Sequence, residues 1–136
     1  MVSALFIPEA VLATIASACR QADLHEACGL LGGIAQGAIG SVRCSLPLMN
    51  EARAANRFWM SPQAVHQARQ QLTALRLRLI GCYHSHPTFD PVPSQNDITA
   101  MRQSQMFWLI HSRRNGRTMA YRWTGTGVQT VPLHLR

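Results

Sequence analysis

The segment between Leu77 and Asp97 constrains the fold more strongly than any other part of this chain. It opens with an apolar run, Leu77 to Tyr83, that is typical of a buried strand and leads directly into His84 and His86. Residues two apart on a strand project to the same face, so both imidazoles can point at one place. The sequence therefore predicts a sheet that presents this pair at the end of a strand.

The residues after the histidines turn the chain back towards them. Residues 87–93 include three prolines, which exclude regular structure and predict an irregular loop. Ser94 then begins a short helix, because Ser-Gln-Asn-Asp has the Ser-x-x-acid form of a capping box. Asp97 would lie in the first turn of that helix, where it could face the histidines. Two nitrogens and one carboxylate oxygen form the ligand set of a catalytic zinc site, which leaves a fourth position for water.

Two simpler interpretations stay open at this point. A His-x-His pair is often no more than two polar residues on a strand. Ser94 and Asp97, taken alone, are most simply a helix cap. The complete string, with its proline-rich turn and a glutamate upstream at Glu26, favours the metal site over both.

The remaining patterns predict a mixed α+β fold, an α/β sandwich. Apolar stripes indicate a helix over Ile7–Ala22, with Pro8 in its first turn, and a second over Ser61–Arg76, with Ser61 as the N-cap. Residues 50–57 form a polar connection, and a single domain over residues 1–136 is expected from the length. Strands are predicted at Ala27–Ile34, Ile39–Leu48, Leu77–Tyr83, Met106–Ser112, Thr118–Trp123 and Val128–Leu135.

Composition excludes several classes of protein. A hydrophobic fraction of 47% with 14% charged residues is that of a folded globular chain. No apolar run approaches the ~20 residues of a membrane span. The N-terminus does not resemble a signal peptide, so we expect no membrane partner and a cytoplasmic location. The net charge is +7, but the arginines are spread along the chain, so no nucleic-acid partner is expected. Four cysteines without a CxxC pair are expected to be reduced thiols.

Two motifs of the chain resemble those of a known family. His84-Ser-His86-Pro, six further residues, and then Ser94 and Asp97 match the His-x-His-Pro-x6-Ser-x-x-Asp motif of the JAMM (MPN+) zinc metallopeptidases. Glu26-Ala-Cys-Gly-Leu-Leu-Gly-Gly is similar to that family's Glu-x-Cys-Gly-Leu-Leu-x-Gly segment. The resemblance implies the MPN/JAMM fold, which is cytidine-deaminase-like and has a mixed, curved β-sheet flanked by helices.

The resemblance also implies a role for each motif residue. His84, His86 and Asp97 would bind one zinc ion per chain. Glu26 would be the general base for the attacking water and then the proton donor to the leaving amine, and Ser94 would donate a hydrogen bond to the oxyanion of the tetrahedral intermediate. The simpler alternatives are an exposed carboxylate at the end of a strand for Glu26 and a helix cap for Ser94.

Two neighbours of the motifs have weaker patterns. Cys82 lies on the same strand face as His84, but the resemblance gives it no ligand role, so a core thiol is the better interpretation. Phe89 lies on the proline-rich loop, where it could be exposed near the site and touch the substrate.

Enzymes of this family hydrolyse a peptide or isopeptide bond, commonly after the C-terminal Gly-Gly of a ubiquitin-like protein. The short connection between Leu48 and Met60 makes this chain similar to the compact bacterial members that act on ubiquitin-like sulfur-carrier proteins. Two alternatives are a non-catalytic MPN scaffold that binds partners and a RadC-like DNA-associated protein. The sequence leaves the oligomeric state open.

Overall fold

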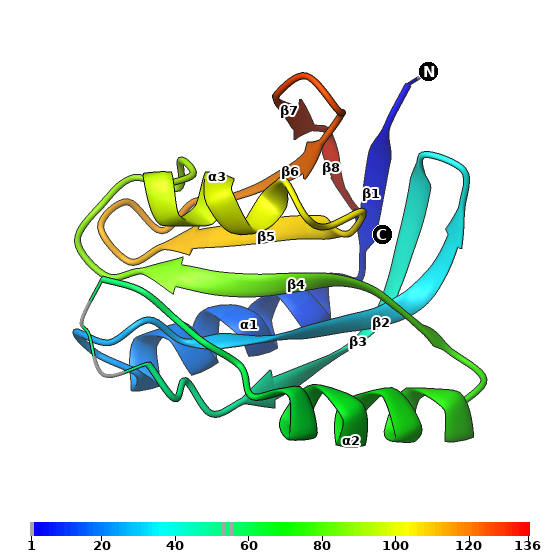
Figure 1. Cartoon of the computed structure of the whole chain (residues 1–136), viewed down its shortest axis with the longest axis horizontal. Coiled ribbons are helices and arrows are strands. Elements are labelled where there is room, and N and C mark those ends of the chain that lie inside the picture. Colours follow the sequence, from blue (N-terminus) through cyan, green and yellow to red (C-terminus); the bar gives the residue numbers. More distant parts are fainter. Residues whose placement is uncertain (1, 53, 55) are drawn as a thin grey trace.

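The computed structural model of the chain describes residues 2–52, 54 and 56–136 (Figure 1). Over these residues it has three helices: α1 (Glu9–Gln21), α2 (Pro62–Ala74) and α3 (Gln95–Met101). Its eight strands are β1 (Ala4–Ile7), β2 (Cys28–Gln36), β3 (Ile39–Leu48), β4 (Arg78–His86), β5 (Phe107–Ser112), β6 (Thr118–Trp123), β7 (Val128–Val131) and β8 (Leu133–Leu135). The predicted mixed α+β class, with a curved sheet flanked by helices, is confirmed.

All eight strands form one mixed sheet in the order β7-β6-β5-β4-β2-β3-β1-β8. β2 runs antiparallel to both β3 and β4, whereas β4 and β5 are parallel. The two edge strands, β7 and β8, are consecutive in the chain and are separated only by Pro132. Because one residue connects opposite edges, the sheet must curl until those edges approach each other, which Figure 1 shows at the red end of the chain. β4 lies near the middle of this curled sheet.

Both faces of the sheet are buried, each by a different set of helices. One cluster joins α1, through Ile15 and Cys19, to strand residues that include Leu31 and Leu109. The other joins Ala68 of α2 and Met101 of α3 to strand residues on the opposite face. Adjacent residues therefore belong to opposite clusters, as the twofold period of a strand requires, in the pairs Leu30 and Leu31, Cys82 and Tyr83, and Trp108 and Leu109. None of the described helices is long and apolar enough to cross a membrane.

The start of the chain differs from its prediction. The expected helix from Ile7 begins at Glu9, because Pro8 is the N-cap, with ψ of 141° in the extended region, and not a first-turn residue. Ile7 ends strand β1, which the sequence analysis missed. A residue before proline is disfavoured in helical conformation, so Ile7 stays extended and pairs with Leu135 of the distant strand β8.

Three other boundaries refine the sequence analysis. The predicted strand Val128–Leu135 is two strands, because Pro132 has no N–H to donate and the chain changes sheet edge there. The strand expected to end at Tyr83 continues to His86, so both histidines lie within β4. Ser61 caps α2 as predicted, accepting a hydrogen bond from the Ala64 N–H.

Gly81 of β4 tests how tightly the central strands pack. A Cβ at this position would lie 2.7 Å from the Phe107 carbonyl oxygen and 3.0 Å from Leu31 Cδ1. Gly81→Ala should therefore lower the free energy of unfolding by about 1–3 kcal/mol, measured by urea denaturation. Gly127→Ala is the matched control, because nothing lies within 4 Å of its Cβ position. Equal stabilities of the two variants would contradict this packing.

Candidate metal centre and active site

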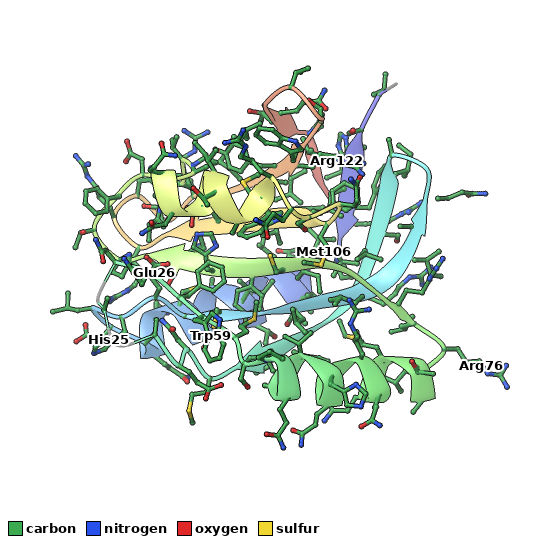
Figure 2. All side chains as sticks on the ribbon, viewed as in Figure 1. His25, Glu26, Trp59, Arg76, Met106 and Arg122 are labelled. Carbon is green, nitrogen blue, oxygen red and sulfur yellow. The ribbon has the colours of Figure 1, made fainter. Side chains whose placement is uncertain are left out.

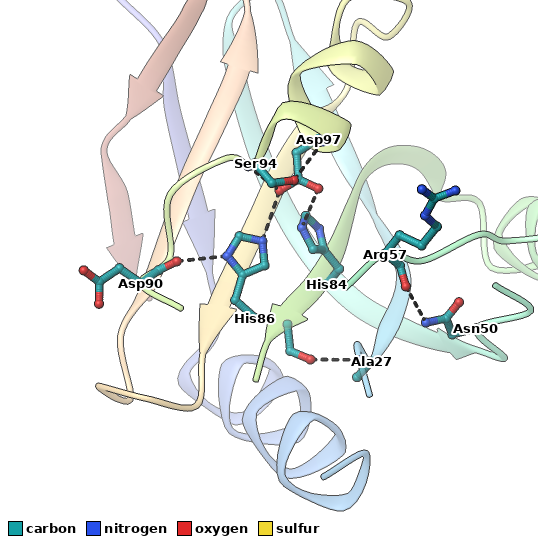
Figure 3. Close-up of polar contacts among 9 residues, drawn as sticks. Ala27, Asn50, Arg57, His84, His86, Asp90, Ser94 and Asp97 are labelled. Carbon is teal, nitrogen blue, oxygen red and sulfur yellow. Dashed lines mark hydrogen bonds and ion pairs between the residues drawn. The ribbon is translucent and has the colours of Figure 1, made fainter. Parts of the chain in front are cut away.

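Strand β4 and helix α3 bring together the three residues that the sequence analysis expected to bind a metal. His84 and His86 project from the same face of β4, and Asp97 lies in the first turn of α3 (Figure 3). All three side chains are buried, and His84 has no exposed surface. One potential ligand atom from each residue can be chosen so that all lie within 4.8 Å of one another. The proline-rich loop reverses the direction of the chain after β4, as predicted, and brings Asp97 back to the histidines.

The Asp97 carboxylate lies between the two imidazoles. His84 Nε2 is 3.0 Å from Asp97 Oδ1, and His86 Nε2 is 3.1 Å from Asp97 Oδ2. On its other side, His86 Nδ1 lies 2.9 Å from the carbonyl oxygen of Asp90, to which a protonated Nδ1 donates (Figure 3). That contact orients the ring and turns Nε2 towards the carboxylate, as the outer hydrogen bond of a metal-binding histidine does.

His84 has two buried nitrogens without a hydrogen-bond partner among the described residues. Its Nε2 has the Asp97 carboxylate beside it, in an ion pair that requires a protonated ring. An unsatisfied buried polar atom is unfavourable by about 1–3 kcal/mol, so such atoms are rare in a closed core. A divalent cation between the three side chains would satisfy His84 Nε2 and balance the carboxylate. The donor set and its burial therefore fit a metal ion.

The pKa values of the cluster follow from burial and from mutual contact. Burial alone would raise the pKa of Asp97, but the adjacent imidazoles and the Ser94 N–H outweigh it and lower the pKa below its usual range. Burial lowers the pKa of His84. Burial also acts to lower the pKa of the less enclosed His86, but contacts with Asp97 and Asp90 outweigh it and raise this pKa. Asp97 and His84 are thus already in the protonation states that a metal requires.

Glu26 lies two residues before the start of β2, near the end of β4 (Figure 2). The alternative of an exposed carboxylate is wrong, because Glu26 is only 5% exposed. It lines a groove of about 840 Å³ together with His86 and Ser94. Burial raises the pKa of Glu26 to about 7, the charge of Asp97 adds to this, and His86 partly offsets it. A carboxyl that titrates near neutrality beside such a cluster can accept and return a proton.

Ser94 caps helix α3 as predicted. Its Oγ accepts a hydrogen bond from the Asp97 N–H at 3.1 Å, and its own N–H donates to Asp97 Oδ2 at 2.9 Å (Figure 3). These two bonds form the capping box. A hydroxyl that accepts through a lone pair still has its O–H to donate. Ser94 can therefore cap the helix and still donate its O–H to a group in the groove.

Three neighbours complete the surroundings of the site. Cys82 is buried, and burial raises the pKa of its thiol far above the usual range, so it is a core thiol as expected. Phe89 is 63% exposed on the wall of the groove. Phe58 stacks on the His84 ring, with centroids 4.5 Å apart and planes 24° apart. Sequence reasoning missed Phe58, because it follows the polar connection 50–57 and has no periodic pattern around it.

The chain is similar to several known proteins. The family model described as prokaryotic homologs of the JAB domain matches residues 8–124. A desampylase of Pyrococcus furiosus is 29% identical over 108 residues, which cover 79% of this chain and 74% of that protein. A desampylase of Haloferax volcanii is 32% identical over 103 residues, covering 74% of this chain and 70% of that one.

A much longer relative and a solved structure extend the comparison. The human deubiquitinase MYSM1 is 34% identical over 93 residues, which are 63% of this chain and 11% of that protein. The solution structure of a protein from Desulfitobacterium hafniense superposes with a TM-score of 0.86 at 25% identity, covering 97% of this chain and 92% of that one. Since the family model spans most of its length, this chain belongs to the prokaryotic JAB-domain branch of the JAMM/MPN family.

Proposed function

We propose that this protein is a zinc-dependent peptidase that hydrolyses the peptide or isopeptide bond after the C-terminal Gly-Gly of a ubiquitin-like protein. The observation that carries the proposal is the buried His84, His86 and Asp97 cluster, with its unpartnered His84 nitrogens, beside a groove that Glu26 also lines. Two imidazoles and one carboxylate are the donors of hydrolytic zinc sites.

The three ligands would leave one coordination position of the zinc free. A zinc ion held there would polarise the scissile carbonyl and acidify a water molecule. His86 would bind through Nε2, because its Nδ1 faces the Asp90 carbonyl. His84 would be held in orientation by the Phe58 ring stacked on it.

Glu26 and Ser94 would perform the proton transfer and the charge stabilisation. The Glu26 carboxylate would take a proton from the attacking water and deliver it to the leaving amine when the C–N bond breaks. The O–H of Ser94 would donate to the oxyanion of the tetrahedral intermediate while its lone pair keeps the cap. Burial supports the first role, since it keeps the pKa of Glu26 near that of a useful base.

The substrate class is inferred from the relatives and from the shape of the site. The relatives named above are desampylases and a deubiquitinase. An extended glycine tail can lie along this groove, and Phe89 on the groove wall offers an apolar contact beside it. Among ubiquitin-like proteins we favour a sulfur carrier, because the short connection between β3 and α2 is similar to that of the compact bacterial members.

Removing a ligand tests the metal centre. Asp97→Ala or His84→Ala should weaken zinc binding by about 100-fold or more, because each change leaves only two protein ligands for the ion. Zinc content per chain after dialysis against a weak chelator measures this. A wild-type protein that folds but retains no zinc would favour the non-catalytic scaffold instead.

Removing the base separates chemistry from metal binding. Glu26→Gln should keep one zinc per chain and lower kcat by about 10²–10⁴-fold, because the amide cannot accept the proton. The assay is cleavage of a ubiquitin-like protein extended beyond its Gly-Gly. Loss of zinc from this variant would mean that Glu26 is a ligand and not the base.

The raised pKa of Glu26 also predicts how stability depends on pH. In the metal-free protein this pKa rises from 4.5 to about 7 on folding, so the folded state holds a proton that the unfolded state has lost. Stability therefore falls as pH rises through this interval and stays lower above it. Metal-free Glu26→Gln should exceed wild type by roughly 1–3 kcal/mol at about pH 8 and by little near pH 4. Urea unfolding at both pH values, with a chelator present, measures the difference, and a constant difference would contradict the burial effect.

A further inference from the structure

The Glu26 carboxylate has no hydrogen bond that fixes its position among the described residues. Its Oε1 is buried without a partner. Because the side chain is buried, packing limits its rotamers, and the position of its Cα then sets where the carboxylate can lie. What holds the backbone at Glu26 therefore decides where the carboxylate lies.

The peptide unit that joins Glu26 to Ala27 is held at both ends by side chains. The Asn50 Nδ2 amide donates to the Glu26 carbonyl oxygen at 2.9 Å. The Ala27 N–H donates to Ser85 Oγ at 2.8 Å (Figure 3). Because a peptide unit is planar and rigid, bonds to its carbonyl oxygen and to its N–H together restrain its position. We call this pair of contacts the peptide clamp.

Ser85 connects the clamp directly to the two histidines. It lies between His84 and His86 on β4, and its side chain is fully buried on the opposite face. There it lies close to the Cys19 thiol of α1. Its N–H also donates to the Ala27 carbonyl oxygen at 3.0 Å. Any displacement of the histidine strand is therefore passed to the residue that follows Glu26.

Asn50 connects the clamp to the other side of the site. Its second Nδ2 hydrogen is donated to the Arg57 carbonyl oxygen, and its Oδ1 accepts from the N–H groups of Ala52 and Trp59. All the hydrogen-bonding capacity of this amide is used. The next residue after Arg57 is Phe58, which stacks on His84. One side chain thus fixes both the backbone of Glu26 and the loop that packs on a histidine.

We propose that Ser85 and Asn50 are positioning residues, which clamp the Glu26–Ala27 peptide and so hold the Glu26 carboxylate at a fixed place relative to His84 and His86. The inference rests on the proposed role of Glu26 as the base. It assigns a function to the middle residue of the His-Ser-His sequence, which the motif leaves free. Neither residue need touch the substrate.

Ser85→Ala, with Ser61→Ala as the matched control, tests the clamp by kinetics. Each change removes one hydroxyl that accepts from one backbone N–H, but Ser61 caps α2 through the Ala64 N–H. Ser85→Ala should lower kcat by about 10- to 100-fold, because a base displaced by a fraction of an ångström works poorly. KM should change less than about twofold and zinc should stay at one per chain, while Ser61→Ala keeps the wild-type kcat.

Asn50→Asp is a second variant in case Ser85→Ala unfolds. The carboxylate keeps an oxygen for Ala52 and Trp59 but loses the hydrogens donated to Glu26 and Arg57. The same loss of kcat at unchanged KM and zinc content is expected. Loss of zinc from either variant would overturn the proposal, because the effect would then lie on the ligands. Unchanged kcat in both would also overturn it.

Hydrogen exchange at the Ala27 amide tests the clamp without any enzyme assay. In metal-free Ser85→Ala this amide should exchange about tenfold faster or more than in wild type or Ser61→Ala, as measured by NMR. Exchange at the wild-type rate would overturn the clamp. A wild-type protein that cleaves no ubiquitin-like substrate would instead overturn the proposed function, whatever the exchange at Ala27.

Discussion

The Asp97 carboxylate is the group on which the arrangement of this site depends. One oxygen faces His84, and the other faces His86 and accepts the N–H of Ser94. The same residue donates its own N–H to Ser94 Oγ, so it helps to start helix α3. A buried anion is tolerated only where such partners surround it. The carboxylate thus joins the end of β4 to the beginning of α3 and holds the intervening loop in place.

The site departs from the packing rules that the rest of the chain follows. Two continuous apolar clusters fill both faces of the sheet. Three of the four buried side-chain polar atoms without a partner in the described part of the chain belong to His84 and Glu26. Conflicts of this kind lower stability, and natural proteins concentrate them where a ligand or a reaction resolves them. The stability that the apolar clusters supply allows the site to keep its unsatisfied donors and acceptors.

The curled sheet explains how residues far apart in sequence meet. β4 lies between β2 and β5, so its terminal histidines are enclosed on both sides. Glu26 enters the site because it precedes β2, whose residue Cys28 pairs with His84. Phe58 arrives from the connection that follows β3, the next strand in the sheet. Neighbouring strands therefore bring Glu26, the two histidines and the Phe58 ring to one end of the sheet.

The sequence by itself determined the features that depend on a few consecutive residues. The twofold period placed His84 and His86 on one face, and the spacing of Ser94 and Asp97 gave the capping box, because backbone geometry sets both. Only the tertiary structure decided what depends on distant partners. Strand β1 forms by pairing with strands from the middle and the end of the chain. Glu26 is buried because the sheet closes around it. The same closure brings Asn50 and Ser85, which are distant in sequence, to the Glu26–Ala27 peptide, and no local pattern encodes it.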